Sequence, residues 1–598
     1  MSGLFLLQNF SVAFTYFPNI SRFLIIITFT FHKYFTNFNI MNNAQIADSF
    51  SLLAKLMDIH GENSFKTKTY ASAAFTIDRL PLQLSETPRE KIVSIKGIGE
   101  STGKKVIELL DTGELSILND LIAKTPEGIL EMMAIKGIGP KKIATIWKEM
   151  EIETVGELLY ACKENRLKLY KGFGEKTQQN IAETIEYFLK GKGSFLFAQI
   201  NLLEIPLKSF FEKLFLKNKI EFTGALKRQL EIISEVELVI DDSIFEIEKT
   251  LKSVDDFELI EKNETDLLYQ SIAGFKIRLH ESDPSTFIKK VFLKSCSPEF
   301  KEAFEISFSS INYTACFNEA DIFKAAELNF IPAYIRENPD TITLAKNQHL
   351  PTVIEVENIK GIIHSHSNWS DGNNTIEEMA KAAITKGFEY LVISDHSKSA
   401  FYANGLNEDR IREQHHYIDS LNAQLAPFKI FKSIESDILN DGNLDYSNAI
   451  LSNFDMVIAS VHSNLKMTEE KAMMRLLTAI ENPFTTILGH MTGRLLLSRK
   501  GYPIDHKKII DACAANNVVI ELNAHPSRLD IDWRFIDYAI KKNVLISIDP
   551  DAHSIEGFDD IQYGVYTAQK AMLTKEQNLS SFSLVELKQF LLKKKGNK

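Results

Sequence analysis

At 598 residues, of which 44% are hydrophobic and 25% charged, the chain is too long for one hydrophobic core and should fold into several domains. Its net charge of −11 does not indicate a nucleic-acid binder, but a domain that binds several cations carries anionic ligands, so whole-chain charge excludes little. The four cysteines form no Cys-x-x-Cys pair, which argues against a disulfide framework or a cysteine-based zinc site and predicts a cytoplasmic protein.

Residues 1–40 differ from the rest of the chain in being rich in Phe and Ile. Their apolar run, residues 23–31, is shorter than the about 20 residues that a membrane span needs. No basic start or small-residue cleavage site marks a signal peptide. Because Met41 opens an ordinary amphipathic stretch, we expect Met41 to be the true start and residues 1–40 to be a misassigned extension, with a weak membrane anchor as the alternative.

Three segments in the N-terminal third repeat a Gly-x-Gly turn that leads into a helical stretch with Lys in its first turns. The glycine pairs are Gly97 and Gly99, Gly137 and Gly139, and Gly172 and Gly174. Such a turn exposes backbone N–H groups at the positive end of a helix, and glycine lets a phosphate approach. The pattern resembles the helix-hairpin-helix motif, which binds DNA backbones without reading sequence. Three copies predict DNA as the partner, whereas a single glycine-rich helix connection is usually structural.

Residues 61–75 resemble the signature of the small N-terminal domain of family X DNA polymerases, the DNA polymerase beta type. In that family a lysine just after the first hairpin can form a Schiff base with a broken sugar. The matching residue is Lys105. A solvated helix lysine or a phosphate contact is the simpler alternative.

The resemblance to family X polymerases continues through a palm and then fails at its active site. That family carries a Gly-Ser turn and three metal-binding aspartates. Here Ala225 replaces the serine, Glu235 and Glu237 replace an Asp-x-Asp pair, and Arg278 falls where the third aspartate belongs. An arginine puts a cation where metal ions should sit. We therefore expect a degenerate palm that serves as a structural or DNA-holding platform, with an active polymerase as the alternative.

Seven apolar, β-branched runs separated by helical patterns fill the C-terminal part of the chain. They are residues 361–363, 390–393, 428–431, 455–458, 486–488, 518–521 and 544–548. This alternation predicts a parallel sheet, which closes into a distorted (β/α)7 barrel. Functional residues of such barrels stand at the C-terminal strand ends.

Potential metal ligands follow those strands. They are His364, His366 and Asp371; Asp395 and His396; Glu435 and Asp437; His462; His490; Glu521 and His525; and Asp551 and His553. A single histidine at a strand end is usually a satisfied polar residue, but six of the seven strands are followed by one. The His-x-His spacing at 364 and 366 places both rings on one face of an extended strand. Imidazoles with carboxylates suit Zn²⁺, Mn²⁺ or Fe.

This set resembles the PHP (polymerase and histidinol phosphatase) domain. The resemblance implies three divalent metal ions, a water molecule held by them as the nucleophile, and Glu435 as a bridge between two ions. The matching ligand positions are His364, His366, Asp371, His396, Glu435, His462, His490, Asp551 and His553. Asp395, Asp437 and His525 are candidate partners for the other ring nitrogens. Arg494 is expected either to contact a phosphate or to form a structural ion pair.

The chain thus resembles a bacterial family X DNA polymerase fused to a PHP domain. The expected division is a small helical DNA-binding domain (41–125), a helical fingers-like region (126–195), a degenerate α+β nucleotidyltransferase-like palm (196–285), a thumb-like region (286–345) and the PHP barrel (350–598). In that family the PHP domain is a manganese-dependent 3′–5′ exonuclease, in some members with abasic-site endonuclease activity. We therefore expect a monomeric DNA-repair nuclease acting on gapped, nicked or primer–template DNA. A small-molecule phosphatase of the histidinol-phosphate kind and a non-catalytic DNA-binding module whose metals stabilise the fold are the alternatives.

Overall fold

The computed structural model describes residues 41–135, 137–150, 152–163, 167, 170, 172–191, 193–272, 274–400, 403–497 and 500–596. The expectation that residues 1–40 are a misassigned extension lies outside these ranges. The chain divides into two compact units, the first ending at residue 192 and the second beginning at residue 193. No helix of the described ranges combines the length and the apolar character that crossing a membrane requires.

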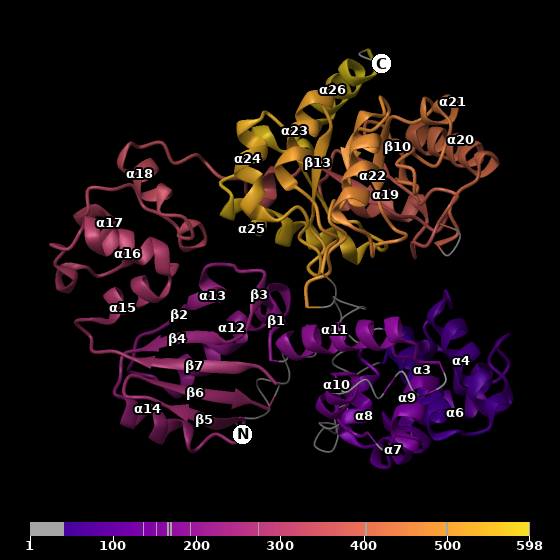
Figure 1. Cartoon of the computed structure of the whole chain (residues 1–598), viewed down its shortest axis with the longest axis horizontal. Coiled ribbons are helices and arrows are strands. Elements are labelled where there is room, and N and C mark those ends of the chain that lie inside the picture. Colours follow the sequence, from indigo (N-terminus) through magenta and orange to yellow (C-terminus); the bar gives the residue numbers. More distant parts are fainter. Residues whose placement is uncertain are drawn as a thin grey trace. The chain divides into compact units, whose positions relative to one another are not determined.

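The described part of the first unit is helical, as expected (Figure 1). Its helices are α3 (Asn43–His60), α4 (Ser64–Asp78), α5 (Arg89–Ile92), α6 (Glu100–Thr112), α7 (Ser116–Ala123), α8 (Glu127–Met132), α9 (Pro140–Lys148), α10 (Val155–Lys163) and α11 (Glu175–Gly191). Helix α3 begins at a capping box formed by Asn42 and Gln45 and ends at the left-handed Gly61. Its buried face, which includes Phe50 and Leu53, joins one apolar core that runs through all these helices.

The second unit begins with a mixed five-stranded palm sheet of order β2-β4-β7-β6-β5. Its strands are β2 (Ile220–Thr223), β4 (Val236–Ile240), β5 (Phe257–Lys262), β6 (Asp266–Ser271) and β7 (Lys276–Glu281). A separate antiparallel pair is formed by β1 (Phe195–Leu196) and β3 (Ile232–Ile233), and the helices of this region are α12 (Phe197–Leu214), α13 (Gly224–Lys227) and α14 (Ile244–Leu251). Strands β4 and β7 run parallel with Glu237 opposite Arg278, so the degenerate positions lie side by side.

Four short helices follow the palm and enclose a phenylalanine-rich core. They are α15 (Phe287–Lys294), α16 (Pro298–Ser307), α17 (Glu319–Ala325) and α18 (Asp340–Lys346). Arg336 is fully buried among these rings, where its Nη1 lies 2.6 Å from Glu319 Oε1 and its guanidinium carbon 5.1 Å from the Phe292 ring. A buried charge persists only when it is paired, and Glu319 supplies that pair.

The C-terminal part is a seven-stranded parallel barrel of order β14-β13-β12-β11-β10-β9-β8, which a bridge between Ser365 and Ala552 nearly closes. The strands are β8 (Gly361–Ser365), β9 (Tyr390–Ile393), β10 (Lys429–Asp437), β11 (Met456–Ser460), β12 (Ile487–Leu488), β13 (Val519–Asn523) and β14 (Ile546–Asp549). The helices packed around them are α19 (Ile376–Thr385), α20 (Glu408–Gln424), α21 (Asn448–Leu451), α22 (Glu469–Glu481), α23 (His506–Asn516), α24 (Ile536–Lys541), α25 (Ile561–Lys570) and α26 (Leu584–Gly596) (Figure 1). The predicted seven-stranded (β/α) barrel is confirmed.

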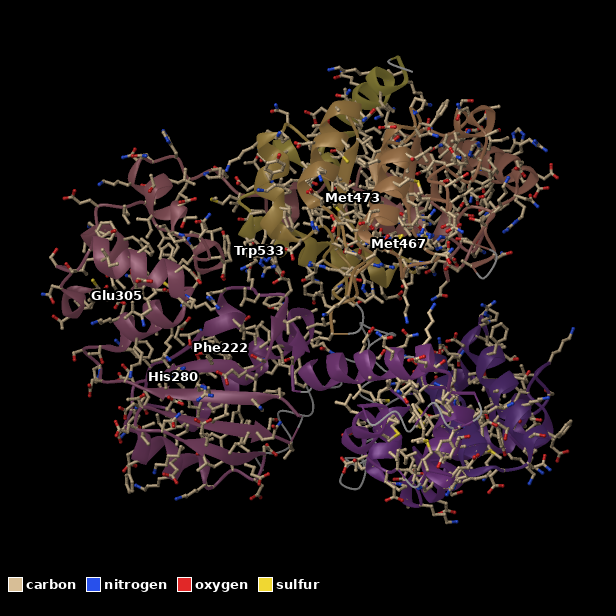
Figure 2. The ribbon with its side chains drawn as sticks, viewed as in Figure 1. Phe222, His280, Glu305, Met467, Met473 and Trp533 are labelled. Atoms are coloured by element: carbon tan, nitrogen blue, oxygen red, sulfur yellow. The ribbon has the colours of Figure 1, made fainter. Side chains whose placement is uncertain are left out.

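Helix α25 joins the barrel to the palm and thumb within the second unit. Its last residue, Lys570, is buried and donates from Nζ to the backbone carbonyl of Arg228 at 2.7 Å. The same ammonium lies 3.4 Å from Glu337 Oε1 and 4.8 Å from the ring centroid of Trp533, a residue labelled in Figure 2. Burial lowers the pKa of Lys570 to about 8, although Glu337 acts in the opposite direction. The barrel lysine therefore donates its hydrogen bonds to the palm and the thumb while its ammonium also contacts the Trp533 ring of the barrel.

Candidate metal centre and its surroundings

The first strand of the barrel turns two histidines toward the rim by an irregularity. The pairing of β8 with β9 shifts between Ile362 and Ser365, and His364 has a positive φ of 59°. The rings of His364 and His366 lie 5.3 Å apart and both are fully buried. The two rings are therefore neighbours, as the His-x-His spacing predicted. The irregular backbone at His364, and not a regular extended strand, brings them together.

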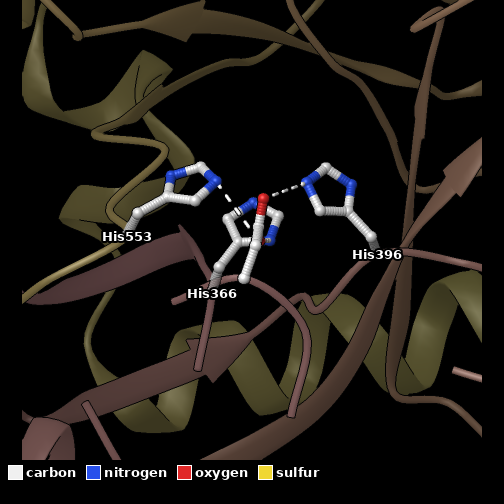
Figure 3. A group of neighbouring side chains, drawn as sticks. His366, His396 and His553 are labelled. Carbon is white, nitrogen blue, oxygen red and sulfur yellow. Dashed lines mark ion pairs between the residues drawn. The ribbon is translucent and has the colours of Figure 1, made fainter. Parts of the chain in front are cut away.

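The nine predicted ligand positions meet at the C-terminal rim of the barrel. Three groups have ligand atoms within 4.8 Å of one another, namely His366, Asp371, His396 and His553; His364, His366 and Asp551; and His396, Glu435 and His462. His490 joins them, since its Nε2 lies 3.0 Å from Glu435 Oε1. Figure 3 shows the rings of His366, His396 and His553 turned toward one another. These groups have the composition and spacing of a divalent-metal site.

Glu435 stands at the centre of the cluster. Its carboxylate oxygens lie 3.0 Å from His490 Nε2, 3.1 Å from His462 Nε2, 3.1 Å from His396 Nδ1, 3.3 Å from His364 Nε2 and 3.6 Å from His366 Nε2. The side chain is 1% exposed. A single buried carboxylate therefore faces imidazole nitrogens from five positions.

The nitrogen and oxygen atoms that face the inside of the cluster are suited to bind a cation. His364 Nε2, His396 Nδ1 and Glu435 Oε2 are buried, face one another and have no hydrogen-bond partner. A buried polar atom without a partner costs about 1–3 kcal/mol, so a protein retains several of them only where another group satisfies them. Nitrogen and carboxylate donors together suit Zn²⁺, Mn²⁺ or Fe better than an oxygen-only cation such as Mg²⁺.

The charges of the cluster depend on each other. Burial opposes protonation of His462, but Glu435 and Asp437 outweigh it and raise its pKa to about 9. Burial and the neighbouring His553 and His396 lower the pKa of His366 to about 3. Burial alone would raise the pKa of Glu435. The positive charges of the surrounding imidazoles outweigh burial and hold this pKa well below its usual range. The carboxylate is therefore anionic at neutral pH.

Two carboxylates hold the outer nitrogens of cluster histidines. Asp437 accepts from His462 Nδ1, as predicted, and is itself bound by the Ser399 hydroxyl. Glu521 accepts from His364 Nδ1 and, at 2.6 Å, from the backbone N–H of His490. Such partners fix the ring orientation and the tautomer of a metal-binding histidine. The role of Glu521 was missed, although its place within β13, two residues after Val519 and on the same face of the strand as that inward-facing residue, was a usable signal.

The other two predicted partners do not contact a cluster histidine. Asp395 accepts from the backbone N–H and hydroxyl of Ser367, at 2.8 and 2.7 Å, and so braces the loop between His366 and Asp371. His525 Nδ1 accepts from the backbone N–H of Ser527 at 3.2 Å. Burial, and then the neighbouring Arg528, lower the pKa of His525 to about 4.

Of the two roles expected for Arg494, the structure shows the ion pair. Its Nη1 lies 2.7 Å from Asp532 Oδ2, its Nε donates to the backbone carbonyl of Arg528 at 2.9 Å, and its Nη2 donates to that of Leu529. A phosphate contact by Arg494 stays a prediction. Arg528 is the arginine that faces the cluster, with its Nε 3.6 Å from Asp551 Oδ2.

Two of the palm positions predicted to be degenerate, Glu235 and Arg278, form an ion pair with each other. The guanidinium of Arg278 binds both oxygens of Glu235, at 2.9 and 3.1 Å, and reaches Asp266 Oδ1 at 2.6 Å. Glu237 Oε2 lies 3.0 Å from His280 Nε2, on the sheet where Figure 2 labels His280 and Phe222. The pKa of Arg278 is raised, first by its hydrogen bond to Glu235. A cation of the protein therefore lies among these carboxylates.

The hairpin turns share one backbone geometry. Gly97, Gly137 and Gly172 have φ of 92°, 93° and 93°, which glycine adopts without strain. Gly99 and Gly139 cap the N-termini of α6 and α9 with ordinary φ values of −70° and −80°, and a Cβ added to either, or to Gly174, would meet no protein atom within 4 Å. The second glycine of each turn thus leaves open space at a helix N-terminus.

Lys105 lies in α6 just after the first hairpin. Its Nζ is 2.6 Å from Glu108 Oε2, and Glu108 also accepts from the backbone N–H of Ser116 at 2.8 Å. The lysine is 29% exposed. This is the contact of an ordinary helix lysine in an i,i+3 ion pair.

Three comparisons relate these parts to known families. Residues 41–115 match the helix-hairpin-helix domain family, residues 129–186 match the SAM-like helix-hairpin-helix tandem family, and residues 363–525 match the PHP domain family. A probable phosphatase of Thermoanaerobacter sp. is 26% identical over 253 residues, 40% of this chain and 97% of that protein. A probable phosphatase of Acetivibrio thermocellus is 28% identical over 169 residues, 27% of this chain and 64% of that protein.

A relative that spans nearly the whole chain unites these segments. The DNA polymerase/3′-5′ exonuclease PolX of Bacillus subtilis is 31% identical over 570 residues, 92% of this chain and 99% of that protein. The hairpins, the palm-like sheet and the metal-cluster barrel described above occur here in the order that such a fusion requires. The chain belongs to the family X DNA polymerases that carry a C-terminal PHP domain.

Proposed function

We propose that this protein is a metal-dependent phosphodiesterase that removes nucleotides from the 3′ end of DNA during repair and no longer extends primers. The observation that carries the proposal is the contrast between its two sites. At the barrel rim, histidines and carboxylates surround Glu435 with unpartnered donor atoms. In the palm, Arg278 already binds Glu235, one of the two carboxylates that replace the Asp-x-Asp pair, and also binds the nearby Asp266.

The nine rim residues would hold three divalent ions, of which Mn²⁺ is the expected metal and Zn²⁺ or Fe the alternatives. Bound metal ions would supply an activated water at neutral pH and would stabilise the departing oxygen. The protein's own part is orientation. Glu521 and Asp437 bind the Nδ1–H groups of His364 and His462, which turns Nε2 of each ring toward Glu435.

The loss of polymerase activity follows from charge. A nucleotidyl-transfer site must leave its carboxylates free for two metal ions. The bidentate contact between Arg278 and Glu235 uses both oxygens of one carboxylate, and its side chains are 19% and 27% exposed. A metal ion would have to displace this guanidinium and then lie beside it. We infer that the palm is retained as a platform for DNA and for the barrel.

The partner that these features suit is the DNA backbone. The space beside Gly99, Gly139 and Gly174 at helix N-termini accepts a phosphate without rearrangement. We therefore propose gapped, nicked or primer–template DNA as the substrate. We also propose a cytoplasmic monomer, in keeping with four buried, unpaired cysteines.

A primer assay tests the proposal. The protein is incubated with a 5′-labelled primer–template, Mn²⁺ and all four nucleotides, beside a His364→Ala variant. We expect primer shortening that disappears in the variant. Primer extension would overturn the interpretation of Arg278, and an unchanged primer would overturn the exonuclease assignment.

A small-molecule phosphatase is the second candidate, favoured by the relatives named probable phosphatase, which match 40% and 27% of this chain. Rates on histidinol phosphate and on DNA, measured with the same preparation, separate the two. Faster turnover of histidinol phosphate would replace the exonuclease proposal.

A further inference from the structure

Arg528 differs from the other arginines of the barrel rim in its lack of hydrogen-bond partners. Among the described residues its guanidinium donates no hydrogen bond, and its one ion-pair partner is Asp551, at 3.6 Å. It is also the one Lys or Arg side chain in the described part of the chain that pairs with a carboxylate of the metal cluster. The side chain is 20% exposed, so solvent and a ligand can reach it. A guanidinium carries five N–H donors, and here most of them are available.

The turn that carries Arg528 is stabilised by Arg494. Arg494 donates to the backbone carbonyls of Arg528 and Leu529 and pairs with Asp532. Leu529 has a positive φ of 45°, which an L-residue adopts only where its surroundings impose it. The guanidinium of Arg494 therefore stabilises the turn through its hydrogen bonds, whereas the N–H groups of Arg528 are available to a ligand.

His525 adds a second donor on the same turn. Its Nδ1 accepts from the backbone N–H of Ser527 at 3.2 Å and contacts the Ser527 hydroxyl at 2.7 Å. An Nδ1 that accepts from a backbone N–H carries no proton, so the proton of the neutral ring is on Nε2. The backbone carbonyl of His525 accepts from the N–H of Arg528 at 2.7 Å, so the two residues belong to one turn.

We propose that Arg528 binds the phosphate of the scissile linkage, with His525 Nε2–H as a second donor and Arg494 as the positioning residue. This inference rests on the proposed function and names the protein contacts of its substrate. The ligand class is a phosphate mono- or diester whose remaining oxygens face the metal cluster. A planar guanidinium binds two oxygens of a phosphate at once, which an ammonium cannot do. Asp551 keeps the guanidinium oriented toward the rim at a distance too long for a direct hydrogen bond.

Binding of inorganic phosphate to the Mn²⁺-loaded full chain tests the inference without requiring turnover. The variants are Arg528→Met and Arg528→Lys, and Arg412→Met is the matched control because Arg412 is 65% exposed and pairs with Asp409 on α20. Phosphate affinity is measured by calorimetry and manganese content by atomic emission. We expect Arg528→Met to weaken phosphate binding about 10- to 100-fold, Arg528→Lys to have a smaller effect, and the control to match the wild type. Manganese content should be unchanged in all of them.

Two results would overturn the inference, namely wild-type phosphate affinity in Arg528→Met, or a loss of bound manganese that parallels the loss of phosphate. The wild-type chain is also assayed on DNA, with KM and kcat measured separately for Arg528→Lys. An Arg528-dependent phosphate site in a chain that does not shorten DNA would leave the inference intact and refute the exonuclease proposal. DNA shortening with a KM that is unchanged in Arg528→Lys and Arg528→Met would refute the inference alone.

Discussion

The carboxylate of Glu521 determines which nitrogen of His364 faces the metal cluster, and replacing it by an amide should disturb that choice. One oxygen accepts from His364 Nδ1 and the other accepts from the backbone N–H of His490 at 2.6 Å. Both side chains of the Glu521–His364 pair are fully buried, so water cannot replace a lost partner. The Glu521→Gln amide has a single acceptor oxygen and must turn its NH₂ group toward one of these two donors.

Both orientations of the amide are unfavourable. If the NH₂ group faces His364, the ring must accept at Nδ1 and carry its proton on Nε2, the atom that lies 3.3 Å from Glu435 and 3.4 Å from Asp551. A protonated Nε2 is no ligand. If the NH₂ group faces His490, a buried N–H loses its acceptor at a cost of about 1–3 kcal/mol. Loss of such a supporting carboxylate typically weakens metal binding about 10- to 100-fold, or about 1.4–2.7 kcal/mol.

Calorimetric titration of metal-free protein with Mn²⁺ measures this directly. We expect Glu521→Gln to lower the affinity by the factor above, with unchanged circular dichroism. Glu389→Gln is the matched control, because this barrel glutamate accepts a backbone N–H from Leu584 at 2.8 Å on the protein surface. Wild-type affinity and stoichiometry in Glu521→Gln would refute the reasoning, since the tautomer of His364 would then not depend on this carboxylate.

Arg278→Met should lower the free energy of unfolding, measured by urea denaturation, by about 1–3 kcal/mol, because the partly buried Glu235 loses its bidentate partner. An unchanged urea midpoint would mean that the pair contributes nothing to stability. Gly99→Val should lower DNA affinity about tenfold or more at a cost in stability of about 1 kcal/mol, since the added side chain meets no protein atom within 4 Å. Gly97→Val should instead lower the stability more than the DNA affinity, because a φ of 92° strains any residue other than glycine. An equal ratio of affinity loss to stability loss in the two variants would contradict this distinction. In metal-free protein the His462 imidazolium, whose pKa rises from 6.5 to about 9 on folding, contributes stability that is complete below pH 6.5 and is lost as the pH rises through 9. Thermal unfolding in a chelator should therefore occur at lower temperature at pH 9 than at pH 6.5, and a higher melting temperature at pH 9 would refute that linkage.

Much of the barrel and its rim could be predicted from local pattern alone. Each apolar run became a strand within a few residues, for example 390–393 as Tyr390–Ile393 and 455–458 as Met456–Ser460. Parallel strands bring their carboxyl ends to one edge whatever the details of packing, so histidines placed after them had to converge. In the palm, Glu237 and Arg278 lie on neighbouring parallel strands, and here the family resemblance and not the local pattern grouped these positions into one site.

The tertiary structure alone decided which side chains support that cluster. Glu521 and His364 are 157 residues apart, and Asp395, which equally follows a strand, turns instead to Ser367 and Gln414. The choice between Arg494 and Arg528 likewise depends on the direction of one turn after β13. Sequence spacing gives the position of a residue along the chain and the face of its strand. The direction of a long side chain within a loop is set by hydrogen bonds from distant segments, which no local pattern records.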